Sequence, residues 1–291
     1  MQVRVVIVAI TWGILNISQS AYAQVTPEVQ SVLYEAADTL GLLRTPREVD
    51  RVITMIYSGS GTRVIEGETC VMDSYRASLR YAIPEIVHPF PVPGMRVDFT
   101  CVVSDAESQR YVQVVAGGYA WDEDEPGGNS ESMPETLRER LLQIWLVPQG
   151  LVKAAVEAGE LATASSNSDG NPVLTFPLPA PLDDTIVEAT FDPEVFLYHT
   201  MPNGTRREFG HRLVHVETEF DGTLVEVTYA DYQDWNESDY KADVLLPGHI
   251  IQTVDGATVM DLNLSLSNTY NPYVVMPLPA NIAAAGTAFS E

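Results

Sequence analysis

Two glycines and two serines alternate in the segment IYSGSGT, residues 56–62. A glycine-rich loop that binds phosphate is followed by a Lys-Ser or Lys-Thr pair and opens a helix. A loop that carries a nucleophilic serine has the pattern Gly-x-Ser-x-Gly between a strand and a helix. Here the strand-forming residues Arg63-Val64-Ile65 follow, so neither chemistry is expected. The segment predicts a bend between two strands, because glycine adopts backbone angles that other residues avoid.

Two groups of carboxylates are further candidates for chemistry. The run Asp122-Glu123-Asp124-Glu125 offers oxygen ligands for calcium, but it lacks the alternating spacing and the central glycine of a calcium loop. The segment YADYQDWNESDYKAD, residues 229–243, could supply paired carboxylates for acid/base hydrolysis. Nothing in the sequence fixes the distance between those carboxylates. Solvated acidic loops are therefore the favoured interpretation of both segments.

The five histidines are scattered, and only His211 and His215 are close in sequence. Residues four apart share one face of a strand, so these two could form half of a metal site. The sequence supplies neither a third ligand nor a His-Glu-x-x-His helix. We therefore predict no metal site, no cofactor and no catalytic residue.

The first 23 residues have the pattern of a secretory signal peptide. Arg4 precedes an apolar run over Val5–Ile17, and the small-residue motif Ala21-Tyr22-Ala23 closes the segment. The apolar run is shorter than the roughly 20 residues needed to span a bilayer, and no later run approaches that length. We expect an exported chain that begins at Gln24, has no transmembrane segment and resides in the periplasm, with secretion as the alternative.

An oxidising compartment permits disulfides, and the chain has two cysteines, Cys70 and Cys101. Both lie in strand-like segments that could be neighbours in one sheet, so a disulfide is predicted. A pair of buried free thiols is the alternative.

The composition limits the partners that the chain can have. Sixteen Lys and Arg residues stand against 40 Asp and Glu residues, which gives a formal net charge of −24. Nucleic acid is an improbable partner because its phosphates would be repelled over most of the surface. Hydrophobic residues make up 45% of the chain, which is enough for a sizeable core.

Two helical regions are predicted. Thr26-Pro27 has the pattern of an N-cap followed by proline, and apolar residues then recur at helical spacing until Gly41. Ser132 and Glu135 have the spacing of a capping box before LRERLLQIW. Pro148 should interrupt this second helix, which then resumes to Ala158. We expect this kinked pair, at about 133–158, to form a lid over the sheet.

The rest of the chain has strand patterns, punctuated by turn signals at Asn203-Gly204, Asp221-Gly222 and Asp255-Gly256. About 11 antiparallel strands in one chain imply a strongly curved sheet or an incomplete β-barrel. The predicted class is mainly β (α+β), with residues 24–291 forming a single domain under a helical lid. The expected strands are 63–66, 75–83, 96–103, 111–115, 173–176, 185–191, 195–201, 211–220, 223–229, 244–253 and 258–267, with another ending at Tyr57.

A curved sheet under a helical lid commonly encloses an apolar pocket, and such a pocket is a ligand site by default. The residues predicted to contact the ligand are Phe99 and Tyr111 on the sheet and Leu141, Trp145 and Leu151 on the lid. An ordinary place in the core is the alternative for each of them.

Five segments together resemble a known family. They are ITMIYSGSGT, YAWDEDEPG, LQIWLVPQGLVKAA, VEVTYADYQDW and LLPGHIIQTVDGATVMDL, in that order along most of the mature chain. They are similar to an exported domain that precedes some metallo-β-lactamase-fold hydrolases and that has the fold of the LolA-like and LolB-like outer-membrane lipoprotein carriers. The chain lacks the His-x-His-x-Asp-His motif of those hydrolases, so their activity is not expected here.

The resemblance implies a half-barrel closed by helices. It also implies an exported binding protein that holds a lipid acyl chain or another apolar ligand. The alternative is a non-catalytic accessory module that binds an exported hydrolase or another envelope protein through its surface.

Overall fold

A computed structural model describes residues 26–43, 49, 51–83, 87–103, 107–200, 203–235, 243–268 and 271–287. The predicted signal peptide, residues 1–23, lies outside these ranges. The helices are α1 (Pro27–Thr39), α2 (Leu137–Trp145), α3 (Pro148–Ala158) and α4 (Ala280–Ala285), with 3-10 turns at Pro134–Thr136 and Gly159–Leu161. The strands are β1 (Thr54–Ile65), β2 (Glu68–Arg80), β3 (Gly94–Val103), β4 (Gln109–Ala116), β5 (Tyr119–Glu123), β6 (Ser130–Ser132), β7 (Thr163–Ser166), β8 (Pro172–Pro177), β9 (Ile186–Asp192), β10 (Leu197–Thr200), β11 (Arg206–Phe209), β12 (Arg212–Phe220), β13 (Thr223–Ala230), β14 (Gln233–Asp234), β15 (Leu245–Leu246), β16 (His249–Val254) and β17 (Ala257–Asn268).

The main sheet is antiparallel and contains 13 strands in the order β6-β5-β4-β3-β2-β1-β17-β16-β13-β12-β9-β8-β7. The predominance of β structure and the large antiparallel sheet are confirmed. The predicted count of about 11 is too low, because the expected strands do not include the polar segments that form β5, β6 and β7. The sheet is open, and among the described residues β6 and β7 form its two edges.

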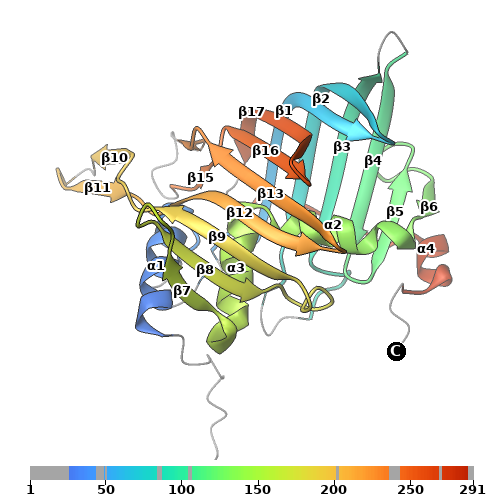
Figure 1. The fold of residues 1–291 in the computed structure, drawn as a ribbon. Helices are drawn as coiled ribbons and strands as arrows, with labels where there is room; N and C mark the ends of the chain where they lie inside the picture. The colour runs from blue at the N-terminus through green and yellow to red at the C-terminus, as the bar shows by residue number, and fades with distance from the viewer. Residues whose placement is uncertain are drawn as a thin grey trace, which may run out of the picture.

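Figure 1 shows α2 between two parts of the curved sheet, with β12 and β13 on one side and β3 and β4 on the other. Tyr229 of β13 donates a hydrogen bond of 2.5 Å to the carbonyl oxygen of Leu146, at the end of α2. The next helix along the chain, α3, packs against α1 and β8. The apolar sides of these helices and the concave face of the sheet therefore share one core.

The glycines at the centre of β1 do not form the predicted bend between two strands. The strand runs without interruption over 12 residues, and the turn follows it at Glu66-Gly67. Its register shifts between Ser58 and Gly59 against β17, and between Gly59 and Gly61 against β2. Glycine allows a close approach here, since a Cβ on Gly61 would lie 1.9 Å from the carbonyl oxygen of Asp261. The segment is therefore a bulged, closely packed part of one strand.

Two of the other predicted strands also differ from the structure. The strand expected at 195–201 is β10, which pairs with β11 in a separate hairpin. The strand expected at 244–253 is divided at Pro247-Gly248 into β15 and β16. Proline has no N–H to donate to a sheet, which explains the interruption. The three predicted turns lie between paired strands, at 203–204, 221–222 and 255–256.

The helix starts are predicted with mixed success. Thr26 caps α1 as expected, because its Oγ1 accepts a hydrogen bond from the N–H of Val29 at 3.4 Å. The capping box predicted at Ser132 and Glu135 does not form, since Ser132 pairs in β6 and a 3-10 turn leads into α2. Pairing with the edge of the sheet takes Ser132 away from the helix start.

No helix in the described ranges is both long enough and apolar enough to cross a membrane.

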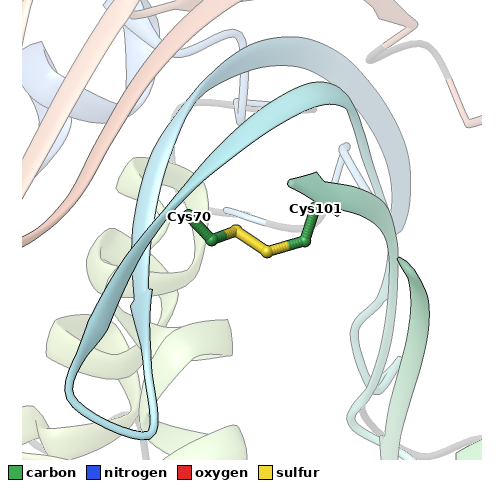
Figure 2. Close-up of a disulfide and its surroundings, with 2 residues drawn as sticks. All are labelled: Cys70 and Cys101. Atoms are coloured by element: carbon green, nitrogen blue, oxygen red, sulfur yellow. A yellow bond between two sulfur atoms is a disulfide. The ribbon is translucent and has the colours of Figure 1, made fainter. Parts of the chain in front are cut away.

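The predicted disulfide is confirmed. Figure 2 shows Cys70 on β2 joined to Cys101 on the neighbouring strand β3. Their Cα atoms are 5.6 Å apart, and both side chains are buried. The bond therefore links two neighbouring strands of the main sheet within the core.

Replacing both cysteines with alanine is expected to lower the free energy of unfolding by about 3–4 kcal/mol. The bond closes a loop with a sequence separation of 31 residues, and a loop of this length restricts the unfolded chain by about that amount. Urea unfolding of the wild type and of the double variant, followed by circular dichroism, measures the difference. Equal unfolding midpoints would contradict the expectation.

Candidate ligand-binding groove

A hollow of about 550 Å³ lies between α2 and the concave face of the sheet. Its walls come from β1 to β4 on one side, from β13, β16 and β17 on the other, and from α2. This volume falls within the roughly 300–1,000 Å³ typical of small-molecule sites. We call this hollow the groove.

One part of the groove is apolar. Ile250 of β16 and Leu262 of β17 are cross-strand partners and both line it. Tyr57 of β1 and Leu146 and Val147 beyond the end of α2 complete this part. All five side chains are less than one-tenth exposed in the chain as a whole. An apolar chain placed here would lose contact with water on several sides.

The groove also contains polar side chains with donor groups. They are Arg63 of β1, Gln113 of β4, Gln143 of α2 and Gln252 of β16. Gln252 is only 7% exposed. Within the described residues, none of the three glutamine side chains forms a hydrogen bond, and Arg63 has neither a hydrogen bond nor an ion pair. A ligand could therefore receive hydrogen bonds without breaking existing ones.

Arg63 is held over an aromatic ring. Its guanidinium carbon lies 5.2 Å from the centroid of Phe99, at a distance typical of a cation–π contact. Phe99 in turn stacks on Tyr111, with 5.1 Å between ring centroids. The stacked rings of Phe99 and Tyr111 hold the guanidinium of Arg63 in place, and its charge stays beside the groove.

Two buried tyrosines line the groove near this arginine. The rings of Tyr57 and Tyr75 lie 6.1 Å apart, centroid to centroid. Burial raises the pKa of both phenols, and the charge of Arg63 opposes the rise at Tyr75. Both hydroxyls therefore stay neutral near pH 7, and Arg63 faces no phenolate.

The second arginine beside the groove, Arg140 of α2, is fully engaged. Its Nη1 donates to the carbonyl oxygens of Val114 at 3.2 Å and Trp121 at 2.8 Å, and its Nη2 lies 2.6 Å from Asp122. Burial lowers the pKa of Arg140, Asp122 opposes this effect, and the charge of Arg63 adds a smaller lowering. Arg140 thus fixes α2 to the β4–β5 hairpin, whereas Arg63 has no carboxylate partner within the described residues.

Acidic residues surround one end of the groove. Glu135, Glu139 and Asp221 are exposed and contribute to its lining. Arg138 pairs with Asp221 at 3.4 Å and with Asp184 at 3.0 Å. A ligand entering here passes a surface with an excess of negative charge.

The five residues predicted to contact the ligand lie in the core beside the groove. Phe99 lies two residues after the lining residue Val97 on β3, and its partner Tyr111 lies two residues before the lining residue Gln113 on β4. On the helices, Leu141, Trp145 and Leu151 are buried in the main core, and Trp145 packs on Tyr81 at 6.3 Å. None of the five contributes to the groove lining. Contact between these side chains and a ligand stays a prediction.

Sequence reasoning missed the polar residues of the groove. The alternation of Ile250, Gln252 and Val254 along β16 indicates one shared face, and all three line the groove. That pattern could have identified Gln252. Arg63 could not be found in this way, because the register shifts at the glycines change how β1 faces its neighbours.

The acidic run at 122–125 is structural, and the prediction of a solvated loop is wrong for its first half. Asp122 and Glu123 belong to β5. Glu123 is buried and accepts hydrogen bonds from the indole N–H of Trp121 at 2.9 Å and from Arg96 at 3.1 Å. Asp124 accepts a side-chain hydrogen bond from Asn129, which lowers the pKa of Asp124. These bonds hold the turn that follows β5.

His211 and His215, which the sequence placed on one face of a strand without predicting a metal site, do not share a cluster of possible metal ligands among the described residues. His215 is grouped with Glu217 and Glu226, while His211 precedes β12 with a positive φ of 51°. A second group contains His199, Asp234 and Asp243.

The second histidine group already contains a cation. The carboxylate of Asp243 is bound by Arg207 at 2.5 Å and by His199 at 3.0 Å. Arg207 therefore already balances the charge of Asp243, and ion pairing accounts for this carboxylate.

No protein-family model matches the chain, and a search of curated proteins found no significant relative.

Proposed function

We propose that this chain is an exported binding protein that holds a lipid acyl chain, or another apolar ligand, in the groove between α2 and the sheet. The observation that carries the proposal is a hollow of about 550 Å³ with an apolar part. Each buried CH₂ group contributes about 0.8 kcal/mol, so an acyl chain gains affinity without any catalytic group.

Two further observations support export. The first 23 residues have the pattern of a signal peptide, and the Cys70–Cys101 disulfide suits an oxidising compartment such as the periplasm. We propose periplasmic residence on these grounds.

Gently purified full chain should carry lipid, which native mass spectrometry followed by lipid extraction would detect. It should also bind a fluorescent fatty acid that unlabelled lipid displaces. The variant Gln143→Trp places a large ring in the groove, because Gln143 is half-buried on α2 and lines it. We expect this variant to bind the fluorescent fatty acid at least about tenfold more weakly, since the ring occupies space that the acyl chain needs.

Leu224→Trp is the matched control, because Leu224 is 37% exposed and alternates along β13 with the lining residue Val225. It should bind as the wild type does. Absence of both co-purifying lipid and fatty-acid binding in the wild type would contradict the proposed function. Unchanged binding in Gln143→Trp would show that the fatty acid binds elsewhere, and equal weakening by the two tryptophans would show that filling the groove is not the cause.

A further inference from the structure

We propose that the ligand of the groove is a long-chain carboxylic acid whose carboxylate binds the guanidinium of Arg63. This inference rests on the proposed function and specifies the head group of the ligand.

The first step concerns the state of Arg63. Within the described residues it lies beside the groove without a carboxylate partner, in a chain with a formal net charge of −24. By contrast, Arg138 and Arg140 on the adjacent helix are both paired with aspartates. A guanidinium presents a planar set of N–H donors that fits a carboxylate with two parallel hydrogen bonds. An anionic head group would supply the partner that the described part of the chain does not.

The second step concerns the neighbours of Arg63 in the sheet. Gln252 pairs with Met260, and Met260 pairs with Arg63, so the three residues form one row across β16, β17 and β1. All three line the groove. Neighbouring strands are about 4.8 Å apart, which places the Cα atoms of Gln252 and Arg63 roughly 10 Å apart on one face. Side chains of this length can reach a single oxyanion between them.

The third step concerns the tail. Leu262 lies two residues after Met260 on β17, and its partner Ile250 lies two residues before Gln252 on the antiparallel strand β16, so the two pairs are neighbouring rows on one face. The polar row and the apolar part of the groove are therefore adjacent on the same two strands. This arrangement fits a ligand with a charged head and an apolar tail.

The fourth step selects the type of anion. The exposed Glu135, Glu139 and Asp221 line the groove, and the chain as a whole is strongly acidic. The negative charge of these residues and of the whole chain repels a dianion more strongly than a monoanion. A carboxylate has one charge, whereas a phosphate monoester has close to two near pH 7, so the carboxylate is favoured.

Calorimetric titration tests the inference, with dodecanoate and dodecyl phosphate below their micelle concentrations and dodecanol below its solubility limit. The wild type should bind dodecanoate about 10- to 100-fold more tightly than dodecanol, because hydrogen bonds to a charged group are worth about 1.5–3 kcal/mol. In Arg63→Gln this preference should disappear while the affinity for dodecanol stays unchanged. Arg63→Lys should keep part of the preference, because it keeps the charge and loses the planar donor set.

Arg110→Gln is the matched control, since Arg110 is exposed on β4, pairs with Asp98 and does not line the groove. It should keep the wild-type preference, and thermal unfolding of each variant checks that the chain is folded. If dodecanol binds as tightly as dodecanoate, the proposed function stands and the head-group inference fails. Tighter binding of dodecyl phosphate would overturn the choice of a carboxylate, and binding of none of the three compounds would overturn both proposals.

Discussion

Replacing Gly61 with alanine should lower the free energy of unfolding by about 3 kcal/mol or more. The added Cβ would lie 1.9 Å from the carbonyl oxygen of Asp261 and 2.9 Å from its carbonyl carbon. Both atoms belong to the backbone of β17, so the clash cannot be relieved by rotation of a side chain. Overpacking of a well-ordered interior typically costs about 1–3 kcal/mol, and a rigid backbone neighbour places this substitution at the upper end. Urea unfolding measures the change.

Two control variants separate the clash with the Asp261 backbone from the general effect of substituting a residue in or next to β1. Ser60→Ala alters the exposed residue beside Gly61 and should change stability by less than about 0.5 kcal/mol. Gly67→Ala, in the turn after β1, has a positive φ of 83° and no atom near the new Cβ. It should cost about 1–2 kcal/mol from backbone strain alone. If Gly61→Ala costs no more than Ser60→Ala, the close approach of β1 and β17 is not required for stability.

Replacing Arg140 with methionine should lower the free energy of unfolding by about 3–5 kcal/mol. The arginine is 8% exposed and bonds two backbone carbonyls and Asp122. Its loss leaves the two carbonyls without this donor and breaks an ion pair whose arginine is buried, although the Asp122 side chain is 38% exposed. The unpaired carbonyls and the broken pair together have a cost of about this size. The attachment of α2 to the β4–β5 hairpin should weaken as well, so ligand binding should fall together with stability.

Arg138→Met is the matched control on the same helix. Arg138 also pairs with aspartates, but its side chain is 32% exposed and those carboxylates are 69% and 60% exposed. Exposed pairs contribute about 1 kcal/mol or less. Chemical unfolding of both variants should therefore give clearly different midpoints. Similar midpoints would mean that the buried network of Arg140 does not anchor α2.

Much of the local structure could be predicted from the sequence. Thr26-Pro27 indicates where α1 begins, and Asp221-Gly222 and Asp255-Gly256 indicate the hairpin turns, because their effects act over a few residues. The mainly antiparallel β class and the Cys70–Cys101 disulfide follow from similar patterns.

The errors arise where distant segments decide the outcome. Glycines in β1 were interpreted as a bend because the strand that packs on them, β17, lies about 200 residues further along the chain. The polar strands β5, β6 and β7 have little strand pattern of their own, and pairing to the sheet defines them. The sequence likewise could not show that Arg63 lies over the ring of Phe99, because the two residues are on different strands.

The open sheet has a consequence for the range of tails that the groove could hold. A closed barrel has a circumference fixed by the number and stagger of its strands. A sheet that ends at β6 and β7 has no such constraint, so its curvature can change without breaking a ladder of hydrogen bonds. The groove beside α2 could then widen or narrow to fit acyl chains of different width. Discrimination between ligands would fall mainly to their charged ends.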